Sequence, residues 1–199
     1  MSEVYIIGAG GHAKVVLDAL KLEGRHTVKS LIDPSEAANI KSYPILNDWK
    51  NLPPSHFVVA IGDNGTRLRC FAELCQTGWK PVTIVHPHAC IASDAILGLG
   101  TVVLAGAIIN SASVVGANVI VNTAATIDHD SNISDHVHLG PGSHLGGGVE
   151  VGEGALIGLG ANVIPYKKIG AWSIVAAGAC VTSSIADKQK IAGVPARPI

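Results

Sequence analysis

The sequence predicts an α/β subdomain at residues 1–84, followed by an all-β parallel β-helix of hexapeptide repeats at residues 85–199. The first observation is a repeat: every sixth residue from Val85 to Val181 is Val, Ile or Leu, at seventeen positions without exception. The second is that this period is absent before residue 85, where strand-like and helix-like segments alternate. The third is composition, because 23 Gly and only 4% aromatic residues require a core of small, regularly placed side chains.

A period of six excludes an α-helix or a coiled coil and is typical of β-solenoids. Each hexad is interpreted as one short strand and one tight turn, and three hexads close a triangular coil whose equivalent positions stack about 4.8 Å apart. The aliphatic residue points into the prism, and the residue four positions later, small everywhere except at Lys167, fits its narrow corner. Residues 85 to about 181 therefore form roughly five coils.

The first eighty-four residues predict a small Rossmann-like sheet of the βαβ type. Strands are expected at residues 4–7, 27–32 and 56–62, with a further strand at 80–85 that leads into the prism. Helices are expected at residues 14–23 and 65–76, and prolines at 44, 53 and 54 mark loops. The subdomain is too short for a complete dinucleotide-binding domain, which favours a mononucleotide or nucleotide-sugar site over NAD.

A glycine-rich turn, Gly8-Ala9-Gly10-Gly11-His12, follows the first expected strand and opens the first helix. Glycines allow the backbone to approach a diphosphate, and a helix N-terminus supplies N–H donors. Asp33 ends the second strand, where it could accept a hydrogen bond from a ribose or sugar hydroxyl. The motif ends in Ala13 instead of Gly, and a turn that serves packing alone is the alternative.

Charge and hydropathy exclude several classes of protein. The formal net charge is -1 and there is no basic stripe, which argues against nucleic acid as a partner. Mean hydropathy is +0.39, but no run of 18 apolar residues is present, so no transmembrane segment is expected. The start, MSEVYIIGAGG, lacks the basic residues of a signal peptide, and a cytoplasmic location is expected. The four cysteines (Cys70, Cys75, Cys90 and Cys180) are expected to be packed, reduced thiols.

The segment TIDHDSNI is the charged exception in an apolar region. Ile127 and Ile133 are inward positions of the repeat, so Asp128, His129 and Asp130 occupy an outer turn. A neighbouring carboxylate can hold one imidazole nitrogen and raise the basicity of the other, which is the arrangement of a general base. A solvated surface histidine is the alternative.

Three more histidines, His136, His138 and His144, lie within the next coil. Clustered histidines raise the hypothesis of a zinc site. Ligands on one face of the prism should recur about 18 residues apart, and these positions do not. No metal is therefore expected within one prism, although a site shared between chains stays open.

Five segments together resemble one known family: GAGGHAKVV at the start, AIGDN at 60–64, NTAATIDHD at 122–130, HLGPGSHLGGGVEVG at 138–152 and AGVPARPI at the end. The resemblance is to the hexapeptide acyltransferases that acetylate nucleotide-activated amino sugars or sialic acids, and most closely to UDP-4-amino-sugar N-acetyltransferases of bacillosamine-type synthesis. It covers essentially the whole chain. It implies a left-handed β-helix and a homotrimer that binds acetyl-CoA between neighbouring prisms.

The resemblance also implies roles for individual residues. The catalytic base falls on His129 and its supporting acid on Asp130, where the family commonly has the longer Glu. The nucleotide-sugar contacts fall on Gly10, Gly11, His12 and Asp33, with Gly62 and Asp63 nearby. The acetyl-CoA contacts fall on His138, Gly147, Leu159 and Ala177. His129 would remove a proton from the sugar amine as the amine attacks the thioester, without an acyl-enzyme.

Three alternatives stay open. A sialic acid O-acetyltransferase would have the same fold and a hydroxyl acceptor. A zinc hydratase of the carbonic anhydrase type would need three converging histidines. A non-catalytic nucleotide-sugar-binding protein would have no use for a base paired with an acid. The sequence does not identify the sugar, or assign roles to His136 and His144.

Overall fold

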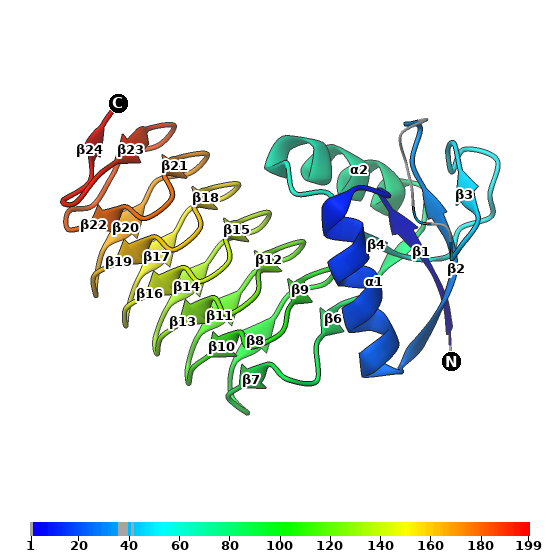
Figure 1. Ribbon diagram of the computed structural model, residues 1–199, viewed down its shortest axis with the longest axis horizontal. Helices are drawn as coiled ribbons and strands as arrows, with labels where there is room; N and C mark the ends of the chain where they lie inside the picture. The colour runs from blue at the N-terminus through cyan, green and yellow to red at the C-terminus, as the bar shows by residue number, and fades with distance from the viewer. Residues whose placement is uncertain (1, 36–39, 41) are drawn as a thin grey trace.

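A computed structural model describes residues 2–35, 40 and 42–199 (Figure 1). An α/β unit forms one end of the molecule, and a parallel β-helix extends from it to the C-terminus at the other end. The predicted fold class is confirmed.

The α/β unit contains a five-stranded parallel sheet of order β3-β2-β1-β4-β5. Its strands are β1 (Ser2–Ile7), β2 (His26–Ile32), β3 (Ile45–Leu46), β4 (His56–Val59) and β5 (Lys80–Pro81). The helices are α1 (Gly11–Glu23) and α2 (Asn64–Gln76). Helix α1 begins three residues before the predicted start, directly after the glycine turn, and the short strand β3 was not predicted.

The two helices lie in different apolar clusters. Val16 and Leu20 of α1 pack with Val4 and Ile6 of β1 and with Leu104 of the β-helix, so α1 lies between the sheet and the first coils. Helix α2 contributes Leu74 to a second cluster with Phe57 and Trp79. The α/β unit is therefore joined to the β-helix by a continuous core.

The β-helix has seventeen two-residue strands, β6 to β22, over the fully described residues 84–181. In chain order they are Ile84–Val85, Cys90–Ile91, Ile96–Leu97, Val102–Val103, Ile108–Ile109, Val114–Val115, Ile120–Val121, Thr126–Ile127, Asn132–Ile133, His138–Leu139, His144–Leu145, Glu150–Val151, Leu156–Ile157, Asn162–Val163, Lys168–Ile169, Ile174–Val175 and Cys180–Val181. Strands β23 (Lys190–Ala192) and β24 (Arg197–Pro198) cover the C-terminal end. Three strands form each coil, one in each of three sheets.

The period of six is explained by the packing inside the prism. Partners in each sheet are 18 residues apart, as in Ile109 with Ile127 and Val115 with Ile133. The predicted inward aliphatic residues are buried from Val103 to Val181, and the small residues of the second register, such as Ala107 and Ser113, are buried beside them. The core is therefore a stack of aliphatic layers closed by small corner residues.

The prism has three corners, and the candidate site residues lie on different ones. The His129 corner, which includes Gly147, joins the sheet of β7 to β22 with the sheet of β8 to β20. The Leu159 corner, which includes Ala177, joins the sheet of β6 to β21 with the sheet of β7 to β22. The third corner holds residues 117–119, 135–137 and 153–155, and it contacts α2.

The fold bears on two expectations from composition: that no transmembrane segment is present, and that the cysteines are packed and reduced. Neither α1 nor α2 has the length and apolar character needed to span a membrane, and the described residues contain no other helix that does. All four cysteines are unpaired. The expectation that they are packed is wrong for Cys75 and Cys90, which are exposed.

Candidate active site

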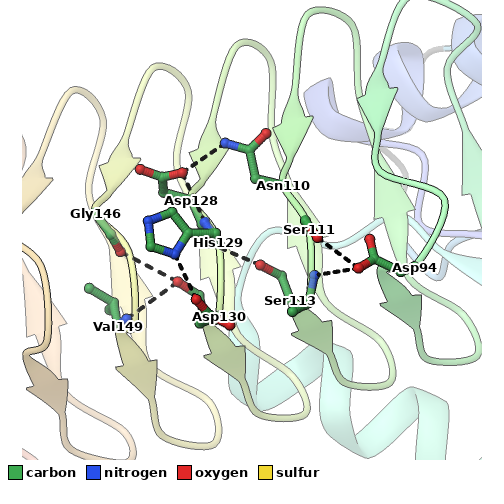
Figure 2. Close-up of polar contacts among 11 residues, drawn as sticks. Asp94, Asn110, Ser111, Ser113, Asp128, His129, Asp130, Gly146 and Val149 are labelled. Atoms are coloured by element: carbon green, nitrogen blue, oxygen red, sulfur yellow. Dashed lines mark hydrogen bonds and ion pairs between the residues drawn. The ribbon is translucent and has the colours of Figure 1, made fainter.

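His129 lies in the turn between β13 and β14, and its side chain is 51% exposed. Its Nδ1 lies 2.7 Å from Asp130 Oδ2 (Figure 2). This contact keeps the proton on Nδ1 and leaves the lone pair on Nε2. No described residue forms a hydrogen bond with Nε2, so this nitrogen can accept a proton from a bound molecule.

Asp130 reaches the imidazole although it is shorter than Glu. Its φ is 58°, in the left-handed region that Asp and Asn tolerate better than most residues. The same turn position has positive φ in other coils, for instance at Ala112 and His136. The repeat itself therefore imposes the backbone that directs this carboxylate to the ring.

Asp128 supports the turn from the other side. Its Oδ1 accepts hydrogen bonds from the backbone N–H of His129 (2.9 Å) and from Asn110 Nδ2 (2.8 Å) (Figure 2). These bonds, the first above all, lower the pKa of Asp128. The hydrogen bond to Asp130 raises the pKa of His129, and the negative charge of Asp128 raises it further.

Asp130→Asn is expected to shift the pH profile of activity. A base acts when neutral, and a raised pKa keeps His129 protonated to a higher pH, so activity falls as the pH drops through that pKa. Asn can still accept the Nδ1 proton but carries no charge. The acid limb of kcat/KM should therefore move to lower pH, with a maximum about tenfold lower. A profile of kcat/KM against pH checks this, and an unmoved acid limb would argue against the Asp130 contact.

Gly147 lies directly beside the His129 ring on the next coil. A Cβ at Gly147 would lie 2.6 Å from His129 Cε1 and 2.7 Å from Nε2. The absence of a side chain is therefore what allows the imidazole to keep its position.

Gly147→Ala is expected to lower kcat at least about tenfold with little effect on folding, because the methyl group displaces the ring from Asp130. The measurements are kcat and Tm. Gly65→Ala is the control, since its new methyl would meet Arg69 Nη1 at an ordinary 3.6 Å. Full activity of Gly147→Ala would show that the ring position is not needed.

A cavity of about 630 Å³ opens at the carboxyl ends of the parallel strands. Five of the residues predicted to contact a nucleotide sugar line it: Gly10, Gly11, His12, Asp33 and Gly62. Parallel α/β sheets usually bind ligands at this edge. Asp63, the sixth, is outside the wall and instead caps α2 by accepting a 2.8 Å hydrogen bond from the Thr66 N–H.

The start of α1 is open to the cavity. Gly10 is its N-cap and makes no side-chain capping bond, and the first turn carries no acidic residue. A Cβ at Gly10 or Gly11 would meet nothing within 4 Å, so a ligand can approach the backbone closely at both residues. Asp33 holds the glycine turn, because its Oδ2 accepts from the Ala9 N–H (2.7 Å) and its Oδ1 from the Ser35 N–H (2.8 Å). This geometry suits an anion such as a diphosphate.

His138 and His12 lie where the cavity meets the β-helix. His138 Nδ1 donates to Gly62 O (3.2 Å), which leaves Nε2 to accept from Asn122 Nδ2 (3.1 Å). The ring centroids of His12 and His138 are 6.2 Å apart. Burial, reinforced by the charge of Arg67, lowers the pKa of each histidine to about 4, so both are neutral at pH 7.

Arg67 joins this wall to the β-helix and was not predicted. It is fully buried, and its guanidinium donates to Ile61 O and Gly62 O (each 3.2 Å), Asn64 Oδ1 (2.9 Å), Asn118 O (3.0 Å), His136 O (2.6 Å) and Val137 O (3.3 Å). Burial lowers its pKa to about 10, which leaves it charged at neutral pH. Its carbonyl partners belong to both the cavity wall and the third corner.

The four residues predicted to contact acetyl-CoA do not form one cluster in a single chain. Gly147 is on the His129 corner, the exposed Leu159 and Ala177 are on the Leu159 corner, and His138 is at the cavity. The sheet between the first two corners bears a shallow groove of about 430 Å³. His144 lies in this groove, where its Nδ1 is 2.9 Å from Thr126 Oγ1.

His136 is the last of the three clustered histidines, and both its ring and its main chain make hydrogen bonds within the chain. His136 Nδ1 is 2.9 Å from Asn118 Nδ2, and its main-chain oxygen binds Arg67. In the part of the chain that the structure describes, no group of three or more His, Cys, Asp or Glu side chains could hold a metal ion.

Residues 3–74 match the family model described as the PglD N-terminal domain. A curated relative, the UDP-N-acetylbacillosamine N-acetyltransferase of Bacillus subtilis (strain 168), is 38% identical over 117 residues. That alignment covers 53% of this chain and 52% of the relative, so the chain spans about half the length of the relative that it matches.

Solved structures also match the whole chain. PerB from Caulobacter crescentus, in complex with CoA and GDP-perosamine, has a TM-score of 0.92 and 39% identity, covering 100% of this chain and 98% of that chain. The acetyltransferase domain of PglB from Neisseria gonorrhoeae FA1090, in complex with acetyl coenzyme A, has a TM-score of 0.95 and 34% identity, covering 100% and 99%. The similarity therefore includes both the α/β unit and the β-helix.

Proposed function

This chain belongs to the family of hexapeptide-repeat, acetyl-CoA-dependent sugar N-acetyltransferases, and from that premise we propose that it acetylates the amine of a nucleotide-activated 4-amino-4,6-dideoxy sugar. The resemblance of its motifs suggested the uridine form of that sugar. The proposal rests on two features found together. His129 has an Nε2 that is available as a base, and a separate cavity contains the uncapped N-terminus of α1.

The positions of these two parts favour an oligomer. The cavity adjoins His138, on the sheet of β6 to β21, whereas the His129 corner lies between the other two sheets. In a triangular prism that corner is opposite the first sheet. One chain therefore keeps its base away from its own cavity, and we propose that neighbouring copies in a homotrimer bring a base and a cavity together.

Acetyl-CoA would lie between adjacent prisms, with Gly147 on one copy and Leu159 and Ala177 on the next. His138, beside the cavity, would then contact the end of acetyl-CoA that carries the thioester. The distribution of charge supports this direction: residues 81–166 contain no Lys or Arg, and the cations that follow are Lys167, Lys168, Lys188, Lys190 and Arg197. The phosphates of acetyl-CoA are at its adenosine end, which would lie near the last coils.

In the proposed reaction the sugar amine attacks the thioester carbonyl. His129 Nε2 takes the proton from the amine as the C–N bond forms, the C–S bond breaks, and the imidazolium gives its proton to the sulfur, so that CoA leaves as the thiol. Asp130 holds the tautomer and stabilises the imidazolium. The glycine turn and His12 would orient the nucleotide sugar at the diphosphate. Direct transfer is proposed because desolvation raises the pKa of the half-buried Cys70 and, although it is more exposed, of Cys75, so neither is an activated thiolate. Because its co-substrate is acetyl-CoA, we propose a cytoplasmic location.

The test is a thiol-release assay with acetyl-CoA and four acceptors: the uridine and guanosine diphosphate forms of a 4-amino-4,6-dideoxy sugar, a sialic acid and its cytidine-activated form. CoA release with either amino sugar, and a product acetylated on nitrogen by mass spectrometry, is the expected result. Release only with a sialic acid would replace the proposal with O-acetylation, and no release with any acceptor would overturn the transferase assignment.

A further inference from the structure

The candidate cavity has two chemically different ends. Gly10 and Gly11 at the start of α1 form the end suited to a diphosphate. The other end lies between the loop after β3, which includes Asp48, Trp49 and Lys50, and one face of α2, which includes Glu73. Glu73 also shares a smaller adjacent cavity with Trp49 and Lys50, so the helix and the loop face each other there. The first end adjoins the β-helix through His12 and His138, so with the diphosphate there and the sugar toward the β-helix, the nucleobase would lie at the second end.

The charged groups at this second end are two carboxylates, Asp48 and Glu73, and one ammonium, Lys50. Asp48 Oδ1 already accepts a 3.0 Å hydrogen bond from the Lys50 N–H, which orders the loop. The carboxylate of Glu73 accepts no hydrogen bond from any described residue, and it projects from the last turn of the thirteen-residue helix α2. Glu73 is therefore the available acceptor on a rigid element.

The two common bases of nucleotide sugars present different edges to such a wall. Guanine offers two adjacent donors, N1–H and the N2 amino group, beside the O6 acceptor. A carboxylate can accept from both donors at once, and an ammonium can donate to O6. Uracil offers a single N–H between two carbonyl oxygens, and a carboxylate facing this edge is repelled by them.

We infer that the cavity binds the guanosine diphosphate form of the sugar in preference to the uridine form, with Glu73 accepting from the guanine N1–H and N2 amino group. This inference rests on the proposed function for the site, and it departs from the uridine form suggested by the motifs. It makes Glu73 a residue that determines specificity and takes no part in acetyl transfer.

Binding of the free nucleotides tests the inference without depending on catalysis. Isothermal titration calorimetry of the full chain should show GDP binding at least about fivefold more tightly than UDP, because one good bidentate contact is worth about 1–3 kcal/mol of discrimination. Glu73→Gln removes one acceptor oxygen and the charge, and should reduce the ratio of the two Kd values at least about fivefold. Glu153→Gln, an exposed change on the third corner, should leave the ratio unchanged.

The possible results distinguish failure of the predicted GDP preference from failure of the proposed acetyltransferase function. UDP binding as tightly as GDP would overturn the inference, even if CoA release with an amino sugar upheld the transferase. A GDP preference that persists in Glu73→Gln would overturn the role of Glu73. Failure of both nucleotides to bind would overturn the assignment of the cavity and this inference, whereas CoA release would still decide the proposed acetyltransferase function.

Discussion

His129→Gln is expected to lower kcat by about 10²–10⁴, the usual contribution of a positioned general base. Gln approximates the size of the ring but cannot take up a proton at neutral pH. The side chain of His129 is half exposed, so its loss removes little buried contact. The KM for both substrates and the Tm should therefore stay close to those of the unchanged protein. Steady-state kinetics of CoA release measures the first effect, and thermal unfolding the second.

The control for this variant is His88→Gln, which removes an exposed histidine from the first coil, far along the chain from the His129 corner. It should retain full turnover. If His129→Gln also kept full turnover, His129 would not be the base. A raised KM for acetyl-CoA with unchanged kcat would instead make His129 a binding residue.

The repeat made most of the fold predictable, because a one-dimensional pattern determines a structure in which each coil contacts its neighbours. Every sixth residue had to be aliphatic to fill the prism, so the inward positions and the outer position of His129 followed from counting. The start of α1 was predicted three residues late. Gly10 and Gly11 have low intrinsic helix propensity, and only the structure showed that Gly10 caps a helix that starts at Gly11.

The candidate site was predictable only in part. The contact of Asp130 with His129 depends on a φ of 58° at Asp130, which an Asp in sequence does not reveal. Asp63 follows a strand, as a ligand-binding residue would, but its carboxylate caps α2. The sequence assigned both Asp33 and Asp63 to the substrate. Both also make intramolecular hydrogen bonds, which no periodic pattern encodes.

Arg67 carried no sequence signal at all. It lies on a helix between Thr66 and Leu68, two residues before another arginine, and an arginine on a helix usually faces solvent. Only the docking of α2 against the third corner brings six oxygen acceptors around it. Main-chain carbonyls are present at every position, so no choice of residue along the β-helix marks the place where they converge.

Arg67→Met is expected to lower the free energy of unfolding by about 3 kcal/mol or more. Replacing a buried ion pair by apolar residues can be neutral, since both desolvated charges disappear. Here the partners are mostly main-chain carbonyls, which substitution cannot remove, so several buried acceptors lose their donor. That loss exceeds the gain from no longer burying a cation. For a chain of this size the Tm should fall by roughly 6–12 °C.

Arg69→Met is the matched control, because Arg69 lies two residues further along α2, is exposed at its guanidinium and donates only to Thr66 Oγ1. Its Tm should change by no more than about 1–2 °C. Arg67 also donates to the Gly62 carbonyl oxygen, which accepts a hydrogen bond from His138. At temperatures where Arg67→Met stays folded, we therefore expect the KM for the nucleotide sugar to rise by a larger factor than kcat falls. If both variants unfolded at the same temperature, the carbonyls around Arg67 would have found other donors. The attachment of the α/β unit to the β-helix would then depend on the apolar core beside α1.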